Sequence, residues 1–479
     1  MKKIKYIILS VVSSAFLLQS CSEDKMDDIN GNKNNPEYVE SKYILTDVMT
    51  NTSFSVVGAD LAYYASIYTE LLGGGYAQMY NAQIRDGEPQ LSSTYNNSWN
   101  NIYRNLRSLK MIREKCAPGG SEVGNYHTLG IAEIMNAYNL AVLTDLWGDV
   151  PYSEALSPKG NPQAKLDKQK DIYLEIFRLL DSGIENLKKQ SDYPNLTKQD
   201  LIFSGNLDKW IKTAYGLKAR YLMRLSAVNP NYQGVLDNIA LSFGSSAEDF
   251  SFRDAKVSYT FYLFRVDRDN LYGSKTFYDL LKNYDEKDPR LVDYFVANKG
   301  KTNLIDHSRN VVQSQGEYVR SGLSEGSANK SNAIYLLSYH EILFLKAEAQ
   351  ARLGNNAEAV KTLNLAIKAG LTKKQSLTYP TYNREVADGL TGQALLKRIA
   401  NEKYISFYEI ESIEAYNDIR RWKAMGENLI ELKHKDPNKF PKRYSYGNSD
   451  VTNNDHIKAI FGDGSYVYSE DVWWAKGTR

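Results

Sequence analysis

Residues 143–156 read Leu143-Thr144-Asp145-Leu146-Trp147-Gly148-Asp149-Val150-Pro151-Tyr152-Ser153-Glu154-Ala155-Leu156. Asp145 and Asp149 lie one turn apart if the chain is helical there, and two carboxylates so placed could hold a cation. Gly148 favours a helix end instead, because glycine is common just after the last helical residue and Pro151 cannot continue a helix. We therefore predict a helix that ends at Gly148.

The segments after this stretch carry apolar residues at helical spacing. Three faces are formed by Ile172, Ile176, Leu179, Leu180 and Leu187; by Trp210, Ala214, Leu217, Tyr221 and Leu225; and by Leu336, Tyr339, Leu343, Ala347 and Ala351. Two long helical pairs are predicted near 128–188 and 206–242. The pattern predicts a mainly α fold.

One helical hairpin is marked by a stop signal at Leu353-Gly354-Asn355-Asn356, after which the apolar pattern resumes at Ala359. The small and large residues from Ala347 to Ala366 have tetratricopeptide spacing. Any closely packed helical pair also needs small residues at its crossing, so one match does not establish a repeat.

Long irregular segments separate the helical blocks, at 70–98, 243–275, 297–333, 370–392 and 433–479. They are rich in Gly, Asn, Ser and Tyr, and they are too long to be simple connections. Loops on a rigid scaffold often carry binding residues. The chain has 36 tyrosines, whose rings suit both helix packing and stacking on a ligand.

The N-terminus has the pattern of a lipoprotein signal. Lys2, Lys3 and Lys5 precede an apolar run from Tyr6 to Leu18, and Leu18-Gln19-Ser20-Cys21 reads as a lipobox. We predict a signal peptide at 1–20, a lipidated Cys21, a flexible tether at 21–38 and a single domain at 39–479. An ordinary secretory signal with a cysteine near its cleavage site is the alternative.

Charge and cysteine content exclude two classes of protein. The formal charge is +2, and loss of the three lysines of the signal peptide lowers it to −1, which gives no electrostatic basis for nucleic-acid binding. The chain has two cysteines, and lipidation of Cys21 leaves Cys116 as a half-buried thiol without a disulfide partner. The lipid is then the only predicted attachment to the membrane.

Known catalytic motifs are missing from the sequence. His340-Glu341 resembles the start of a zinc-protease helix, but Phe344 stands where the second histidine ligand belongs. Gly73-Gly74-Gly75 lacks the lysine of a phosphate-binding loop, and there is no Gly-x-Ser-x-Gly elbow. We predict no enzyme activity, no metal and no cofactor, although 57 acidic residues leave a glycosidase-like carboxylate pair open.

Five segments, in order, resemble the SusD/RagB family of surface nutrient-binding lipoproteins. Residues 143–156 resemble the family stretch "DLYGDVPYxEAL", and residues 399–422, with Asp418, Arg420 and Arg421, resemble its C-terminal helix. The others are Trp99-Tyr103-Leu106, Asp288-Pro289-Arg290-Leu291 and Val472-Trp473-Trp474. Together they span nearly all of the mature chain.

This resemblance implies a fold of four tetratricopeptide-like helix pairs packed with an irregular, loop-rich ligand-binding part. It also implies an outer-membrane lipoprotein that faces the cell exterior and acts as a lid on a SusC-like TonB-dependent barrel. The ligand in this family is usually an oligosaccharide, and in some members a peptide. The residues here do not separate the two cargoes.

Two aromatic segments are the predicted ligand-binding residues. Tyr76, Gln78, Tyr80 and Asn81 follow the triple glycine, and aromatic faces beside amides suit sugar rings and hydroxyls. The second set is Tyr262, Phe264, Arg265 and Tyr272. Alternating aromatics there could equally form a strand packed on the helices.

Two other candidates have a structural interpretation that we favour. Asp418, Arg420 and Arg421 could clamp a carboxylate ligand, but their helical context favours an ion-pair network between helices. Trp99 could stack on a sugar, but its spacing to Tyr103 and Leu106 favours the core. The remaining alternatives for the whole chain are a lipid-anchored hydrolase and a structural adaptor that binds the barrel alone.

Overall fold

The computed structural model describes residues 38–156, 160–253, 259–325, 332–372, 384–386 and 388–479. It groups Met1–Glu40 in one unit and Ser41–Arg479 in another, and the description below concerns the second. The predicted signal peptide, Cys21 and residues 21–37 of the predicted tether lie outside the described residues. Among the residues that the structure describes, no helix combines the length and apolar character needed to cross a bilayer.

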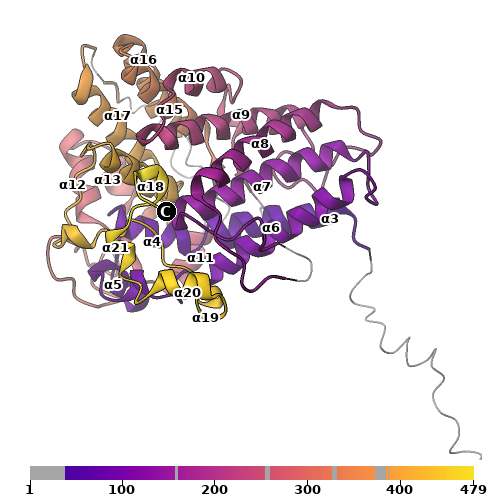
Figure 1. The fold of residues 1–479 in the computed structure, drawn as a ribbon. Helices are drawn as coiled ribbons and strands as arrows, with labels where there is room; N and C mark the ends of the chain where they lie inside the picture. The colour runs from indigo at the N-terminus through magenta and orange to yellow at the C-terminus, as the bar shows by residue number, and fades with distance from the viewer. Residues whose placement is uncertain (1–37, 157–159, 254–258, 326–331, 373–383, 387) are drawn as a thin grey trace, which may run out of the picture. The chain divides into compact units, whose positions relative to one another are not determined.

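The second unit is mainly helical, as the apolar spacing predicts (Figure 1). Its α-helices are α3 (Ser41–Asn51), α4 (Asp60–Tyr68), α5 (Ala77–Ile84), α6 (Asn96–Cys116), α7 (Tyr126–Trp147), α8 (Gln169–Lys188), α9 (Leu207–Arg224), α10 (Tyr232–Ile239), α11 (Thr260–Asp267), α12 (Lys275–Tyr284), α13 (Arg290–Asp293), α14 (Gly322–Glu325), α15 (Tyr339–Arg352), α16 (Asn356–Thr372), α17 (Gly392–Ser406), α18 (Ser412–Ala424), α19 (Asn448–Asn453), α20 (Asp455–Phe461) and α21 (Tyr466–Ser469). A π-helical turn, η1 (Thr52–Val57), joins α3 to the loop before α4.

In the part of the chain that the structure describes, six short strands form three two-stranded antiparallel sheets. The strands are β1 (Leu72–Gly74), β2 (Phe250–Phe252), β3 (Leu271–Gly273), β4 (Phe295–Val296), β5 (Arg320–Ser321) and β6 (Ile334–Leu337). They pair as β1 with β3, β2 with β6 and β4 with β5. The predicted irregular segments therefore contain short elements of regular structure.

Helices α6, α7, α8 and α9 lie side by side in Figure 1, and each packs against the next. Almost all of α7 is buried, because α6 and α8 cover it from two sides. The five apolar residues predicted on one face of α8 are all buried. The core of this array is therefore built from the faces that the sequence predicts.

The hairpin predicted around residues 353–356 is confirmed as α15 followed by α16. The extension of its first helix back to Leu336 is wrong. Leu336 lies in β6, which pairs with β2, and the hydroxyl of Ser338 accepts a hydrogen bond from the Glu341 N–H (3.1 Å), so the helix begins at Tyr339. A capping serine is a strong helix-start signal, and here it decides the boundary.

The helix end predicted in residues 143–156 is confirmed, because α7 ends at Trp147 and Gly148 has φ +80°. Both flanking carboxylates have structural partners. Asp145 accepts hydrogen bonds from the Tyr173 hydroxyl and from Arg224 (3.3 Å). Asp149 pairs with Lys168 (2.8 Å) and accepts from the N–H of Gln169 (2.9 Å), at the start of α8. Residues 143–156 therefore end α7 and, through Asp149, hold the start of α8 in place.

The segment after α18 returns to the first half of the chain. The N–H of Tyr444 donates to the carbonyl of Leu146 (2.8 Å), and the indole of Trp147 donates to the carbonyl of Ser445 (2.7 Å). Tyr444 stacks on Tyr95 with ring centroids 4.0 Å apart. Many of the tyrosines pack in this core, and Trp99 is fully buried, as its helical spacing predicts.

Candidate ligand-binding site

The first predicted segment is an exposed face of α5. Tyr76 precedes the helix and is 39 % exposed, and Gln78 and Asn81 are exposed beside it. Tyr80 is half-buried in the first turn of α5, and its N–H donates to the carbonyl of Tyr76 (3.1 Å). This face presents aromatic and amide groups together to solvent.

A small hydrophobic cluster packs against the buried side of Tyr80 and supports this face. Tyr272, Ile305, Val311 and Tyr318 form a buried group apart from the main core, and the half-buried Tyr80 packs against it. The rings of Tyr272 and Tyr318 lie 5.7 Å apart between centroids. The position of Tyr80 is therefore fixed by packing rather than left to a free loop.

The structure brings the two predicted segments together through β1 and β3. Gly73 is the register partner of Tyr272, and the N–H of Gly75 donates to the carbonyl of Asn270 (3.0 Å). A Cβ on Gly75 would lie 2.6 Å from the Tyr272 ring, so only glycine permits this approach. The triple glycine thus allows close packing of the two segments.

The second segment is divided between two environments. Residues 260–267 form the helix α11, not the strand that the alternating aromatics allow. Phe264 packs on Tyr63 with centroids 4.3 Å apart, and Arg265 donates to the carbonyl of Ser324 (2.6 Å) and lies over the Tyr262 ring. Tyr272 is fully buried, and its hydroxyl donates to the carbonyl of Asp269 (2.5 Å). The exposed groups of the site are those of α5, and Tyr272 supports them.

Sequence reasoning does not identify the residues near position 434 that hydrogen-bond to α5 and to Glu70. The carboxylate of Glu70 accepts the N–H groups of Lys433 (2.9 Å) and His434 (2.8 Å). His434 Nδ1 accepts from the N–H of Asp436 (3.1 Å), which leaves the proton on Nε2 to donate to the carbonyl of Gln83 in α5 (3.1 Å). Partners separated by more than 300 residues leave no local signal in the sequence.

The pH dependence of this support follows from His434. Burial, helped by the Arg85 guanidinium, lowers the pKa of His434 from 6.5 to about 4. The unfolded chain therefore binds a proton before the folded chain does, so this contribution to stability is full above pH 6.5 and is lost as the pH falls towards 4. We expect urea midpoints measured between pH 7 and pH 4 to fall less in His434→Gln than in the wild type. The exposed His456, changed to Gln, serves as the control, and equal slopes in wild type and His434→Gln would contradict the assignment.

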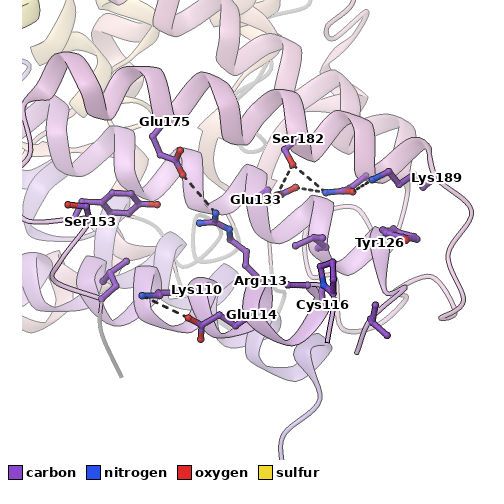
Figure 2. A pocket seen from close by; sticks show the side chains of 17 residues that line it. Lys110, Arg113, Glu114, Cys116, Tyr126, Glu133, Ser153, Glu175, Ser182 and Lys189 are labelled. Atoms are coloured by element: carbon purple, nitrogen blue, oxygen red, sulfur yellow. Dashed lines mark hydrogen bonds and ion pairs between the residues drawn. The ribbon is translucent and has the colours of Figure 1, made fainter. Parts of the chain in front are cut away.

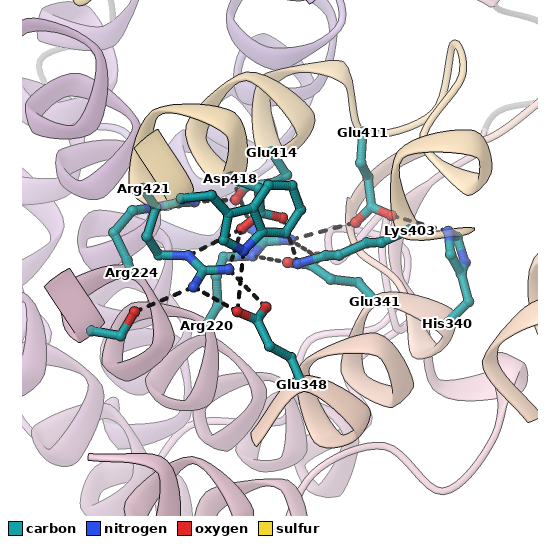
Figure 3. Close-up of polar contacts among 12 residues, drawn as sticks. Arg220, Arg224, His340, Glu341, Glu348, Lys403, Glu411, Glu414, Asp418 and Arg421 are labelled. Atoms are coloured by element: carbon teal, nitrogen blue, oxygen red, sulfur yellow. Dashed lines mark hydrogen bonds and ion pairs between the residues drawn. The ribbon is translucent and has the colours of Figure 1, made fainter. Parts of the chain in front are cut away.

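The Asp418 and Arg421 motif lies in a buried ion-pair network, as its helical context predicts (Figure 3). Arg421 binds Glu348 of α15 with two hydrogen bonds (2.8 and 2.7 Å), and Lys403 of α17 pairs with Asp418 (2.6 Å). The neighbouring Arg420 donates to the carbonyl of Asp145 (2.9 and 2.8 Å). These groups hold helices together and are closed to a ligand.

The same network contains the buried carboxylates Glu341 and Glu411, both bound by Arg220. Burial raises the pKa of Glu411 well above its usual range, and the nearby Glu341 carboxylate adds to this effect. Both side chains are at most 2 % exposed, so a polymeric substrate has no access to this pair. Among the described residues, no three His, Cys, Asp or Glu side chains come together as a metal site would need.

A cavity of about 740 Å³ opens between α6 and α8 (Figure 2). Its walls include Arg113 and Glu114 from α6 and Glu175 and Ser182 from α8, and its floor includes Leu129 and Glu133 from α7. Cys116, predicted to be half-buried, also lines the cavity but is only 3 % exposed, and burial raises the pKa of its thiol to about 12. No sequence motif marks this cavity, because it is assembled from three separate helices.

Comparison with known proteins places this fold in one family. The family model described as starch-binding and associating with the outer membrane, SusD-like, matches residues 35–446. The chain belongs to the SusD-like family, which confirms the resemblance in residues 143–156 and 399–422. Among curated proteins, none matches.

Solved structures agree with the family model. A SusD/RagB family protein from Bacteroides thetaiotaomicron VPI-5482 is 36 % identical with a TM-score of 0.82, over 92 % of this chain and 100 % of that one. A chitin-binding protein is 21 % identical with a TM-score of 0.71, over 91 % and 100 % of the two chains. A chitin-binding SusD homologue from Flavobacterium johnsoniae is 17 % identical with a TM-score of 0.70, over 90 % and 98 %. The last two show the fold alone.

Proposed function

We propose that this chain is a surface lipoprotein that captures an oligosaccharide and delivers it to a SusC-like TonB-dependent barrel in the outer membrane. The observation that carries the proposal is the α5 face, with Tyr76, Gln78 and Asn81 exposed beside Tyr80 in a chain of the SusD-like family. The protein binds and does not catalyse, and it needs no cofactor.

The chemistry of the α5 face suits a sugar. Tyrosine rings stack on the apolar face of a sugar ring, and amide side chains both donate to and accept from its hydroxyl groups. The strand pairing and the cluster around Tyr272 hold Tyr80 in place before a ligand arrives. Less conformational freedom is then lost on binding, which favours affinity.

We expect Tyr76→Ala combined with Tyr80→Ala to weaken oligosaccharide binding by about five- to 150-fold, since two stacked rings at about 0.5–1.5 kcal/mol each contribute about 1–3 kcal/mol. Calorimetry with starch and chitin oligosaccharides, and with peptides, measures this effect. Tyr43→Ala is the matched control, because Tyr43 is a tyrosine of α3 that is 52 % exposed. Binding of peptides but of no glycan would show that the cargo is a peptide. Shortened products after incubation of the protein with its ligand would show that it is an enzyme.

The anchor makes a separate prediction. Cys21→Ala removes the predicted lipid attachment, so we expect the protein to leave the membrane fraction, to keep its fold and its affinity for the glycan, and to lose nutrient uptake. Cell fractionation, calorimetry and growth on the bound glycan measure the three effects. Normal uptake by this variant would show that neither the anchor nor an anchored lid is needed. Co-purification of a barrel with the lipidated protein tests the partner directly.

A further inference from the structure

The cavity between α6 and α8 shares no residue with the α5 face, and nothing in the proposed function uses it (Figure 2). Its volume of about 740 Å³ lies within the range of small-molecule sites, which is about 300–1,000 Å³. Figure 2 shows Arg113 of α6 extending across the cavity towards Glu175 of α8. Both helices are anchored on α7, so the walls are rigid elements.

Arg113 interacts with Glu175 and with the Tyr152 hydroxyl, and it has hydrogen-bonding capacity beyond these two partners. Its guanidinium carries five N–H donors, and its ion pair with Glu175 is long, at 3.9 Å. Glu175 is already engaged by Arg178, which donates to both of its oxygens (2.6 and 2.8 Å). The side chain of Arg113 is 28 % exposed. A ligand in the cavity can therefore take donors that neither Glu175 nor Tyr152 occupies.

Glu133 supplies acceptors on the floor of the same cavity. One of its oxygens accepts from the Ser182 hydroxyl and the other from the Asn186 amide, both at 2.8 Å. Each oxygen of a carboxylate has two lone pairs, so each retains one acceptor position. The residue is only 5 % exposed, and burial raises its pKa. A ligand hydroxyl that donates to Glu133 would replace part of its lost solvation.

The charges around the cavity balance one another. Three cations face three carboxylates: Lys110, Arg113 and Lys189 against Glu114, Glu133 and Glu175. An ionic ligand would gain from one set and lose to the other, whereas hydroxyl groups can both donate and accept. The rings of Tyr126 and Tyr152, with Leu129 and Leu156, provide apolar surface for the C–H face of a sugar.

We propose that this cavity is a second ligand-binding site, which takes a short neutral saccharide between α6 and α8. Arg113 and Glu133 bind its hydroxyl groups, and Tyr126 and Tyr152 contact its ring. The site is independent of the α5 face and goes beyond the proposed function. It gives the chain two saccharide sites on different parts of the fold.

The test uses the full chain with three substitutions, Cys21→Ala, Tyr76→Ala and Tyr80→Ala. The last two remove the tyrosine rings of the α5 face. Calorimetry with glucose, maltose, N-acetylglucosamine and N,N′-diacetylchitobiose should still detect binding of at least one. Adding Arg113→Ala should then weaken that binding at least tenfold. Arg104→Ala is the matched control, because Arg104 lies on the same helix, pairs with Asp47 at 2.9 Å and does not line the cavity.

Several results would overturn the proposal. They are absence of binding by all four sugars, equal loss with Arg113→Ala and Arg104→Ala, or binding of glycylglycine in place of the sugars. Thermal melting checks that each variant is folded, and Tyr126→Ala gives a second test that leaves the ion pairs intact. Failure of this cavity leaves the α5 site standing, since the Tyr76 and Tyr80 variants test that site in the chain with Arg113 present.

Discussion

Glu348→Ala is expected to lower the free energy of unfolding by about 3–5 kcal/mol, the usual cost of removing one partner from a buried ion pair. Glu348 is fully enclosed, and its carboxylate binds Arg421, Arg352 (2.8 Å) and the indole of Trp422 (3.1 Å). Its loss leaves two guanidinium groups without their shared anion. Urea denaturation measures the change.

Glu358→Ala is the matched control. Glu358 lies on the next helix, α16, and pairs with Lys361 at 2.7 Å, but both side chains are at least 60 % exposed. Exposed ion pairs contribute little to stability, so the urea midpoint should stay unchanged. Equal midpoints for Glu348→Ala and the wild type would mean that the network does not stabilise the fold.

The effect of Glu348 also has a pH signature. Burial would raise the pKa of its carboxyl, but Arg421 and Arg352 outweigh burial and hold the pKa far below the ordinary 4.5. A depressed pKa gives stability that is complete above pH 4.5 and is lost as the pH falls. The difference in stability between the wild type and Glu348→Ala should therefore shrink below pH 4.5.

Gly148→Ala should be the second most damaging of the proposed changes. Gly148 has φ +80° and ψ −126°, a conformation that costs a residue with a side chain about 1–3 kcal/mol. A Cβ there would also lie 1.8 Å from Nη2 of Arg443, a fully buried guanidinium that donates to the carbonyls of Trp147 and Arg479. Displacing it should add about 1–3 kcal/mol, the cost of leaving a buried polar group unsatisfied.

Gly354→Ala separates the two effects. Gly354 also follows a helix and has φ +82°, but no atom lies within 4 Å of the position its Cβ would take. This variant should lose only the backbone contribution, about 1–2 kcal/mol. Thermal or urea unfolding of both variants gives the comparison, and equal losses would rule out a contribution from the contact with Arg443.

Helices with a long periodic face could be predicted from the sequence, and so could the end of α7 at Gly148. The spacing does not locate the start of α15, because Leu336 continues the helical pattern although it lies in β6. The aromatics of α11 alternate as strand residues do, so the pattern alone does not identify this helix, whose Phe264 packs on Tyr63. In short elements, tertiary contacts determine the secondary structure more than the local sequence pattern does.

The candidate site was predictable in its exposed part only. An aromatic and amide run after three glycines identifies Tyr76 and Gln78, but strands of three residues carry no pairing signal, so the contact of β1 with β3 could not be foreseen. The same limit applies to Glu348, whose partners Arg421 and Trp422 lie on α18, and to Glu133, which becomes a cavity residue only when α6 and α8 flank α7.

The return of residues 433–446 to the first half of the chain has a kinetic consequence. Two of its hydrogen bonds, from Trp147 to Ser445 and from Lys433 to Glu70, join positions 298 and 363 residues apart, and such distant contacts form slowly because large loops must close first. Helices α6 to α9 can associate early, while α5 keeps no support from Glu70 and His434 until the final segment has emerged. We therefore expect the nascent chain to remain open during synthesis, and α5 to gain this support only when the whole chain has been made.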